Sequence, residues 1–139
     1  MKALLFHCKE YGTKIDRLAN RPGNIIPEDI KKKEQKCKSC LVVLVTIEQG
    51  DILKTSTSGL AKEIKKMSEE VKQKTIVLMP FAHLSNKLAN TKKGIEALNS
   101  IETKLKGKFK ILRGHFGSHK SLLLDVYGHP GNVRYREFY

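Results

Sequence analysis

Residues 40–47 (Cys-Leu-Val-Val-Leu-Val-Thr-Ile) constrain the fold more than any other segment of the chain. They are dense in β-branched residues and nearly continuous in apolarity. A strand with one face in water alternates polar and apolar residues, whereas a strand that is covered on both faces does not need to alternate. The segment therefore predicts a central β-strand, with other elements packed on both sides of its sheet.

Two later segments carry apolar residues at the spacing of amphipathic helices. In the first, the apolar residues recur at intervals of four, three and four: Leu60, Ile64, Met67 and Val71. We expect a loop at residues 55–59 before it, with several residues suited to capping a helix. In the second, Asn90–Thr91 provide a cap, and the apolar residues that follow are Gly94, Leu98, Ile101 and Leu105. Two helices with one apolar face each can cover a sheet.

Short apolar runs predict further strands at residues 2–7, 75–79, 108–112 and 121–126. Residues 11–27 are polar and rich in Gly and Pro, so we expect a loop there. Pro27 then opens a short helix that continues through Lys33. Alternating strands and helices indicate an α/β fold. We predict a single domain over residues 1–139, with helices packed on a mixed sheet whose last two strands form a hairpin.

The charge of the chain predicts a polyanionic partner. There are 27 Lys plus Arg against 14 Asp plus Glu, which leaves 27 − 14 = +13 at pH 7. Small domains usually carry a net charge of magnitude about 2–8. Nucleic acid is the first candidate partner, an acidic membrane surface is the second, and a solvated lysine-rich surface is the alternative. No apolar run is long enough for a membrane span or a signal peptide, so we expect a cytoplasmic protein.

The three cysteines, Cys8, Cys37 and Cys40, are an odd number. Together with the missing signal peptide, this indicates a reducing compartment. Cys37 and Cys40 form a C-x-x-C pair, for which a structural role, a metal and a redox function are all open. A zinc site needs two more ligands at comparable spacing, and only His7–Cys8 are near in type. We therefore expect no metal and no cofactor.

Polar and titratable residues follow the predicted strands at residues 80–85, 115–120 and 128–131. Ligands of α/β sheets gather at the carboxyl ends of parallel strands. His83 and Lys120 are the candidate reactive groups, although His83 would also suit the cap of a short turn, and Lys120 would also suit the surface. We find no Ser-His-Asp or Cys-His arrangement and no closely spaced pair of carboxylates.

These segments resemble a known family, the N-terminal editing domain of archaeal threonyl-tRNA synthetases, which is related in fold to D-aminoacyl-tRNA deacylases. The resemblance covers nearly the whole chain. The most specific match is residues 80–85 (Pro-Phe-Ala-His-Leu-Ser). Weaker matches, in the family's order, are residues 4–8 (Leu-Leu-Phe-His-Cys), 41–48, Phe116–Gly117 with Lys120, and 128–130 (Gly-His-Pro). The resemblance implies a D-aminoacyl-tRNA deacylase-like fold.

The resemblance implies an editing hydrolase, which deacylates mischarged L-seryl-tRNA(Thr) and spares threonyl-tRNA(Thr) by substrate-assisted attack of water. One methyl group changes binding by only about 1–3 kcal/mol, so a synthetase needs a second site to reject serine. The implied partners are the acceptor end of tRNA(Thr) carrying serine, a threonyl-tRNA synthetase catalytic domain, separate or fused, and a second copy of the chain as a homodimer. A membrane partner is not implied.

The resemblance also assigns residues. It makes Lys120 and His83 catalytic, with Lys120 placing and polarising water and His83 positioning the terminal ribose. The substrate-binding residues are Ile47, Pro80, Phe81, Ala82, Phe116, Gly117 and His119. His7, His129 and Glu137 are supporting candidates.

Two positions depart from the family pattern. His119 stands where the family has tyrosine, and Val133 stands where it has an acid, with Glu137 the nearest carboxylate. Two other functions therefore stay open. One is a D-aminoacyl-tRNA deacylase, and the other is a tRNA-binding module with weak catalysis.

Overall fold

The long antiparallel pair β1 (Lys2–Leu18) and β2 (Glu34–Thr46) organises the fold. The computed structural model describes residues 1–21, 23 and 25–139. These residues form a six-stranded sheet in the order β4-β3-β2-β1-β5, with β6 paired to the first part of β1. The later elements are α1 (Leu53–Val71), β3 (Thr75–Pro80), α2 (Thr91–Leu105), β4 (Lys110–Arg113), β5 (Ser118–Val126) and β6 (Val133–Glu137).

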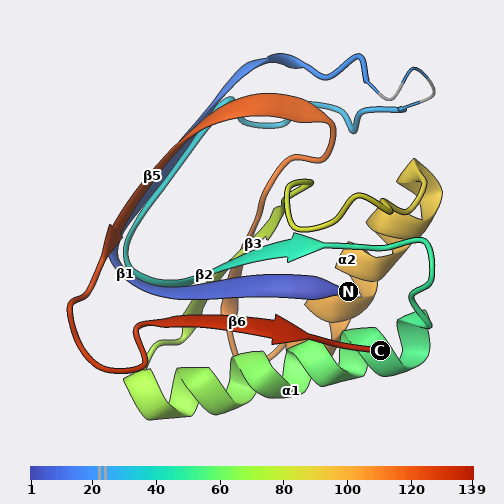
Figure 1. Cartoon of the computed structure of the whole chain (residues 1–139). Helices are drawn as coiled ribbons and strands as arrows, with labels where there is room; N and C mark the ends of the chain where they lie inside the picture. Colours follow the sequence, from blue (N-terminus) through green and yellow to red (C-terminus); the bar gives the residue numbers. More distant parts are fainter. Residues whose placement is uncertain (22, 24) are drawn as a thin grey trace.

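The β1–β2 pair bends in its middle, and its far half curves back over the rest of the molecule (Figure 1). The register of β1 against β5 shifts between Cys8 and Glu10, as at a β-bulge, and bulges bend a strand. We call the curved part the arch: residues 11–18 of β1, 34–39 of β2, and 118–124 of β5.

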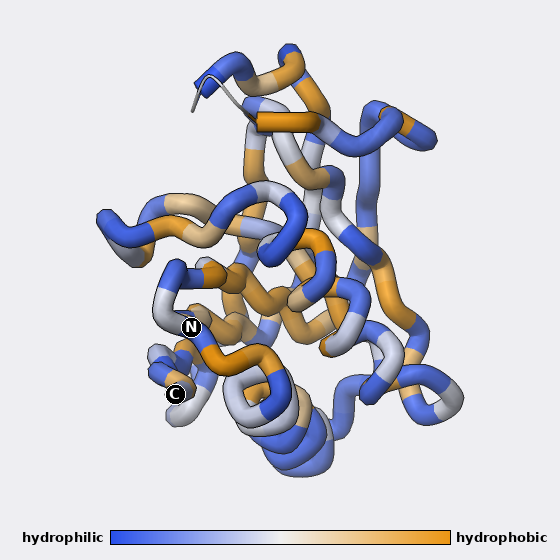
Figure 2. Tube along the Cα trace, turned by 90° about the vertical axis from the view of Figure 1, so that its right-hand side faces the viewer, coloured by the Kyte–Doolittle hydropathy of each residue, from blue (hydrophilic) through white to orange (hydrophobic). Residues whose placement is uncertain are grey.

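The central strand predicted at residues 40–47 is confirmed. Leu41, Val43 and Val45 are buried in the cluster that also contains the apolar faces of α1 and α2. Val42 and Leu44 point to the opposite face and are buried in a second cluster with Cys8, Tyr11, Val77 and Met79. Figure 2 shows hydrophobic residues gathered among the strands in the middle of the molecule, while the outer turns and loops are largely hydrophilic.

The predicted mixed sheet is confirmed, but the predicted hairpin of the last strands is wrong. β4 pairs in parallel with β3 at one edge, whereas β5 pairs antiparallel with β1 at the other side. The sheet is mixed because β1 runs antiparallel to β2, β5 and β6, while β2, β3 and β4 are parallel. The segment 128–139, which carried no predicted element, contains β6.

Two predictions for residues 11–33 are also wrong. β1 continues to Leu18 through the expected loop at residues 11–27, of which Pro22 and Asn24 lie outside the described residues. Residues 27–33 form no helix, because Glu28 N–H donates to the Phe116 carbonyl and the Lys33 carbonyl accepts from Ile15 N–H. These contacts keep the segment extended between two neighbours.

The expected loop at residues 55–59 lies inside α1, which begins at Leu53. The Ser56 and Thr57 hydroxyls donate to the carbonyls of Ile52 and Leu53, one turn earlier, at 3.0 and 2.5 Å. Such bonds let buried Ser and Thr lie within a helix. The apolar faces predicted for both helices are confirmed, and the Asn90 side chain caps α2 by accepting from Lys93 N–H at 2.9 Å. In the described part of the chain, neither helix is long and apolar enough to cross a membrane.

The cysteines lie in or beside the β1–β2 pair. Cys8 and Cys40 are cross-strand partners, both buried, and Cys37 lies nearer the start of β2. All three are free thiols. Burial raises the pKa of Cys8 to about 11, and it raises the pKa of Cys40 as well. Because the thiolate is the reactive form, these two buried thiols are unreactive at neutral pH.

Candidate active site

A cavity of about 490 Å³ lies between the arch and the carboxyl ends of β2 and β3. The end of β2, the segment after β3 and the start of α2 line one side of it. The start of β5 and the end of β1 line the other side. Segments distant in sequence therefore meet at one place, as expected for the ends of parallel strands.

The structure brings all the predicted catalytic and substrate-binding residues to this cavity. The nine residues that line it are Ile47, Pro80, Phe81, Ala82, His83, Phe116, Gly117, His119 and Lys120. They come from three separate segments of the chain. His83, Lys120 and Ile47 thus converge on one cavity.

Residues 81–90 follow β3 and run beside the extension of β2. Phe81 N–H donates to the Val45 carbonyl at 2.9 Å, and Ala89 N–H donates to the Ile47 carbonyl at 3.0 Å. The Thr46 hydroxyl also donates to the Phe81 carbonyl. These bonds fix the backbone of the wall formed by Pro80 and Ala82.

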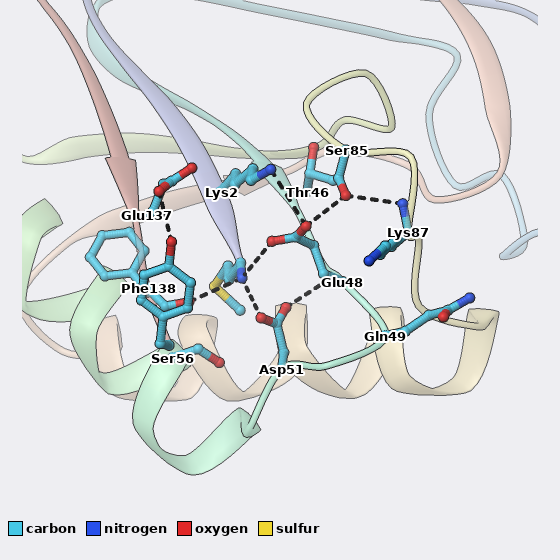
Figure 3. Close-up of polar contacts among 12 residues, drawn as sticks. Lys2, Thr46, Glu48, Gln49, Asp51, Ser56, Ser85, Lys87, Glu137 and Phe138 are labelled. Carbon is cyan, nitrogen blue, oxygen red and sulfur yellow. Dashed lines mark hydrogen bonds and ion pairs between the residues drawn. The ribbon is translucent and has the colours of Figure 1, made fainter.

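An ion cluster behind this wall fixes the same segment (Figure 3). The Ser85 hydroxyl donates to Glu48 Oε2 at 2.6 Å, and the Met1 α-ammonium lies 3.1 Å from Glu48 Oε1. The ammonium also contacts Asp51 and donates to the Phe138 carbonyl at 3.0 Å. The Ser85 hydrogen bond, the ammonium and Lys2 hold the pKa of Glu48 below its usual value. Glu48 therefore stays ionised and links the segment to the core.

Glu28 holds the opposite wall of the cavity. Its carboxylate accepts from Phe116 N–H at 2.9 Å and pairs with the Arg113 guanidinium at 3.3 Å. Its backbone N–H donates to the Phe116 carbonyl at 3.0 Å, and its carbonyl oxygen lies 2.7 Å from His115 Nε2. Four contacts from one residue thus define the path of the chain from residue 113 to residue 116.

Two glycines permit the close packing of this wall. Gly117 has φ +92°, and a Cβ there would lie 2.7 Å from Pro27 Cα. A Cβ on Gly94 of α2 would lie 3.0 Å from the Phe116 ring. Glycine alone meets both requirements at residue 117, because other residues rarely adopt positive φ. The Phe116 ring therefore seats directly on α2.

Lys120 is the cation at the wall of the cavity. It is half-buried on β5, opposite Ile15 of β1, and its ammonium donates to the Ser118 carbonyl at 3.1 Å. Burial lowers the pKa of Lys120, and the Glu28 carboxylate opposes that shift. The ammonium is thus partly desolvated, so it stabilises a nearby negative charge more strongly than a surface lysine does.

The two histidines of the cavity differ from Lys120 in being exposed. The His83 ring meets the Phe81 ring edge-on, with centroids 4.9 Å apart. Among the described residues, the His83 imidazole forms no hydrogen bond with the turn that it was alternatively expected to cap. His119 lies on β5 next to Lys120. Both imidazoles are open to a ligand.

The three supporting candidates lie elsewhere. His7 Nδ1 and His129 Nε2 are 2.7 Å apart, beside the Tyr127 ring. Burial and His129 lower the pKa of His7. Glu137 is on β6, where it accepts hydrogen bonds from Tyr135 and Tyr139. None of the three lines the cavity, and neither does Val133, which pairs with Phe6.

Several lining residues were not found from the sequence. Thr13, Arg21, Asn90 and Thr91 line the cavity, and Glu28 acts behind it. Glu28 was assigned to the first turn of a helix that does not form. No carboxylate or thiol lines the cavity within the described part of the chain. The arrangement therefore suits a ligand that carries or develops negative charge, and that charge would face Lys120 and Arg21.

This architecture defines a class, the α/β domains with the D-aminoacyl-tRNA deacylase-like fold. The solved structure of c-Myc DNA Unwinding Element Binding Protein matches 99% of this chain and 98% of that protein with a TM-score of 0.70. Their sequences are 16% identical, so the likeness concerns the fold alone. The predicted fold class is confirmed.

Sequence relatives define the family within this class. The model of the family described as the archaea-specific editing domain of threonyl-tRNA synthetase matches residues 1–138. Threonine–tRNA ligase of Staphylothermus marinus is 35% identical over 133 residues. The threonine–tRNA ligase editing subunit of Saccharolobus solfataricus is 33% identical over 130 residues. Each match covers 94% of this chain but only 21% and 32% of the two relatives. The chain belongs to the archaea-specific editing domains of threonyl-tRNA synthetase.

Proposed function

We propose that this editing domain hydrolyses L-seryl-tRNA(Thr) and spares threonyl-tRNA(Thr). The observation that carries the proposal is the make-up of the cavity, in which backbone and apolar groups lie beside one partly buried lysine ammonium. Such a site can hold a small aminoacyl ester beside the ammonium. The relatives named threonine–tRNA ligase support threonine as the amino acid to be spared.

Selection against threonine would use the shape of the pocket. Threonine differs from serine by one methyl group. The cavity is bounded by the apolar side chains of Ile47, Pro80 and Ala82, which form no hydrogen bonds. The backbone of this wall is fixed to β2, as described above. Because an extra methylene in a tightly packed site typically costs about 1–3 kcal/mol, a rigid wall would reject threonine sterically.

The proposed reaction is ester hydrolysis assisted by the substrate. Water oxygen forms a bond to the ester carbonyl carbon, and the bond from that carbon to the ribose oxygen breaks. The ribose oxygen gains a proton, and serine leaves as a carboxylic acid that releases its proton to solvent. The Lys120 ammonium would orient the water and stabilise the oxyanion. His83 would hold the ribose, whose 2′-hydroxyl takes part in the proton transfer.

Two of the proposed partners follow from this substrate: the acceptor end of tRNA(Thr) carrying serine, and a threonyl-tRNA synthetase catalytic domain on a separate or a fused chain. The third, a second copy of the chain in a homodimer, is proposed from the family resemblance alone. We expect the chain to act in the cytoplasm. The ribose 2′-hydroxyl would let it distinguish RNA from DNA.

A paired deacylation assay tests the proposal. Ser-tRNA(Thr), Thr-tRNA(Thr) and a D-aminoacyl-tRNA are incubated separately with the protein and with Lys120→Ala. We expect selective loss of serine, and a fall in kcat for Lys120→Ala that exceeds any fall in tRNA affinity. Equal cleavage of the seryl and threonyl esters contradicts the proposed selectivity. Faster cleavage of the D-aminoacyl ester favours a D-aminoacyl-tRNA deacylase. Binding without any turnover favours a tRNA-binding module.

A further inference from the structure

A second cavity, of about 700 Å³, adjoins the first and is used by no step above. We propose that it is a phosphate-binding groove, which holds the sugar–phosphate backbone of the single-stranded RNA 3′ end just before the terminal adenosine. Residues 25–33, here called the strap, would bind that backbone through Lys31, Lys32 and Lys33. The inference rests on the proposed function, because it assumes that the esterified ribose occupies the first cavity.

The position of the groove makes it continuous with the first cavity. Both cavities are lined by Thr13 and Lys120. In β1, Ile15 pairs with Lys120 on one side, and its N–H donates to the Lys33 carbonyl at 2.8 Å on the other. The lysine run and Lys120 therefore flank the same residue of the arch. An RNA strand leaving the first cavity past Lys120 would pass directly onto the strap.

The charges of the groove favour an anion. Its lining holds five cationic side chains against three carboxylates, which leaves 5 − 3 = +2. Two of the carboxylates, Glu28 and Glu102, lie 3.3 and 3.5 Å from the single guanidinium of Arg113, and Asp29 is the third. Lys31, Lys32 and Lys33 are exposed, and none of them is in an ion pair within the described residues. Three ammonium groups that are in no ion pair, beside a concave surface of net positive charge, suit successive phosphates, which bind lysine without sequence preference.

Another course for the RNA would leave on the opposite side, over residues 81–92. Lys87 and Lys92 are exposed there. That side offers two exposed lysines, and the neighbouring Lys93 is half-buried with its ammonium already donating to the Gln49 carbonyl at 2.6 Å. The strap instead offers three consecutive exposed lysines at the rim of a second cavity. The strap is also held to β1 and to Phe116 by backbone hydrogen bonds. The geometry therefore favours the groove, and the other course is an outcome of the test.

The test compares two substrates and three variants of the full chain. The substrates are a seryl acceptor-stem minihelix and 2′(3′)-O-seryl-adenosine, which carries no phosphate. The strap variant is K31Q/K32Q/K33Q. The matched control, K54Q/K62Q/K66Q, removes the same charge from exposed positions of α1, which lies at the opposite end of the molecule (Figure 1). The third variant is K87Q/K92Q.

For the strap variant, we expect kcat/KM for the minihelix to fall about tenfold more than kcat/KM for seryl-adenosine, mainly because KM for the minihelix rises. For the α1 control, kcat/KM should change equally on the two substrates. Three results would each overturn the proposed groove. The strap variant could lose kcat/KM equally on both substrates, the strap and control variants could lose it equally on the minihelix, or K87Q/K92Q could lose more of it than the strap variant.

A binding measurement separates this inference from the proposed function. Fluorescence anisotropy with an uncharged single-stranded RNA ending in CCA, across a series of KCl concentrations, needs no hydrolysis. Each phosphate contact on a single strand contributes about 0.7 to the slope of log K against log salt, so the strap variant should lose about 2 from that slope. An unchanged slope overturns the groove even if hydrolysis is selective. A reduced slope supports it even if no ester is cleaved.

Discussion

At the scale of single residues, Glu28 contributes most to the shape of the site without lining the first cavity. Its carboxylate holds the Phe116 N–H and Arg113, and it opposes the lowering of the pKa of Lys120. Two effects are therefore combined in one side chain, a hydrogen bond that places a loop and a charge that keeps the lysine protonated. They can be separated because glutamine keeps the hydrogen-bond acceptor but not the charge.

Glu28→Gln should move the alkaline limb of the pH–rate profile for seryl-tRNA to lower pH. The carboxylate raises the pKa of Lys120, so its removal lets the ammonium lose its proton at a lower pH. Glu28→Ala should in addition destabilise the fold by about 1–3 kcal/mol, because the Phe116 N–H loses its acceptor. Kinetics across pH and denaturant unfolding measure the two effects.

Glu102→Gln is the matched control for this prediction. Glu102 also contacts Arg113, at 3.5 Å, but it does not contact the loop at residues 116–117. Its removal changes the net charge equally and should leave the alkaline limb in place. If both variants shift the limb alike, the general charge of the region, and not Glu28, determines the behaviour of Lys120.

Gly117→Ala should destabilise the protein by about 1–3 kcal/mol and close part of the cavity. The left-handed backbone alone costs a non-glycine residue about 1–2 kcal/mol, and the new Cβ would lie 2.7 Å from Pro27 Cα. Gly107→Ala is a close control, because Gly107 has φ +86° with nothing within 4 Å of its would-be Cβ. Denaturant unfolding of both variants separates strain from collision. Equal destabilisation would show that contact with Pro27 costs nothing.

At the scale of elements, the sequence predicted those whose residues pack regularly. The strand at residues 40–47 was found because burial on both faces leaves a continuous apolar run. The helix faces were found because burial on one face leaves apolar residues at helical spacing. The far half of β1 was missed because its outer face is solvated: Lys14 and Asp16 alternate with Thr13 and Ile15. The start of α1 was missed because its hydroxyls are satisfied by helix carbonyls, which propensity alone does not reveal.

The residues of the site also divide into those that the sequence revealed and those that it did not. The segments at residues 80–85 and 115–120 were found because reactive side chains follow strands, and the ends of strands meet in space. Glu28 was missed because its contacts are with residues more than eighty positions later in the chain. His7 and His129 were grouped with the site by motif order, yet β1 and the β5–β6 connection place them together, away from the cavity. In both cases, the position of the residue depends on which distant parts of the chain lie side by side, and the sequence pattern does not reveal this.

The segment at residues 81–90 depends on an ionised Glu48, which predicts loss of stability in acid. Because the folded pKa of Glu48 lies below its ordinary value of 4.5, its contribution is complete above that value and is lost as pH falls through the folded pKa. Between about pH 5 and about pH 3, the Tm of the wild type should fall more than that of Glu48→Gln. Ser85→Ala, which removes the largest cause of the shift, should lie between them.

The exposed Glu69 on α1 provides the control for this measurement. Glu69→Gln should follow the wild type across the same range of pH. A Tm of Glu48→Gln that falls in parallel with the wild type would mean that other carboxylates, such as Asp51 on the same ammonium, govern the acid limb.

At the scale of the whole molecule, the net charge of +13 serves two opposing ends. It attracts a polyanion over the whole surface, and it makes the folded chain repel itself. The nine ion pairs of the described residues act against this repulsion. Three of them include an exposed group and are individually weak, and the other six are largely shielded from solvent, so that salt screens them less. Self-repulsion should therefore outweigh the ion pairs in their response to salt.

Raising KCl should consequently stabilise the fold while it weakens RNA binding. The Debye length falls from about 10 Å at 0.1 M to about 3 Å at 1 M, which screens the long-range repulsion among lysines. We expect a rise in Tm of about 2–5 °C, together with weaker binding of RNA ending in CCA. K54Q/K62Q/K66Q lowers the net charge from +13 to 13 − 3 = +10 and should show a smaller rise in Tm. A Tm that falls with salt would mean that the ion pairs, and not the excess lysines, dominate the electrostatics of the folded chain.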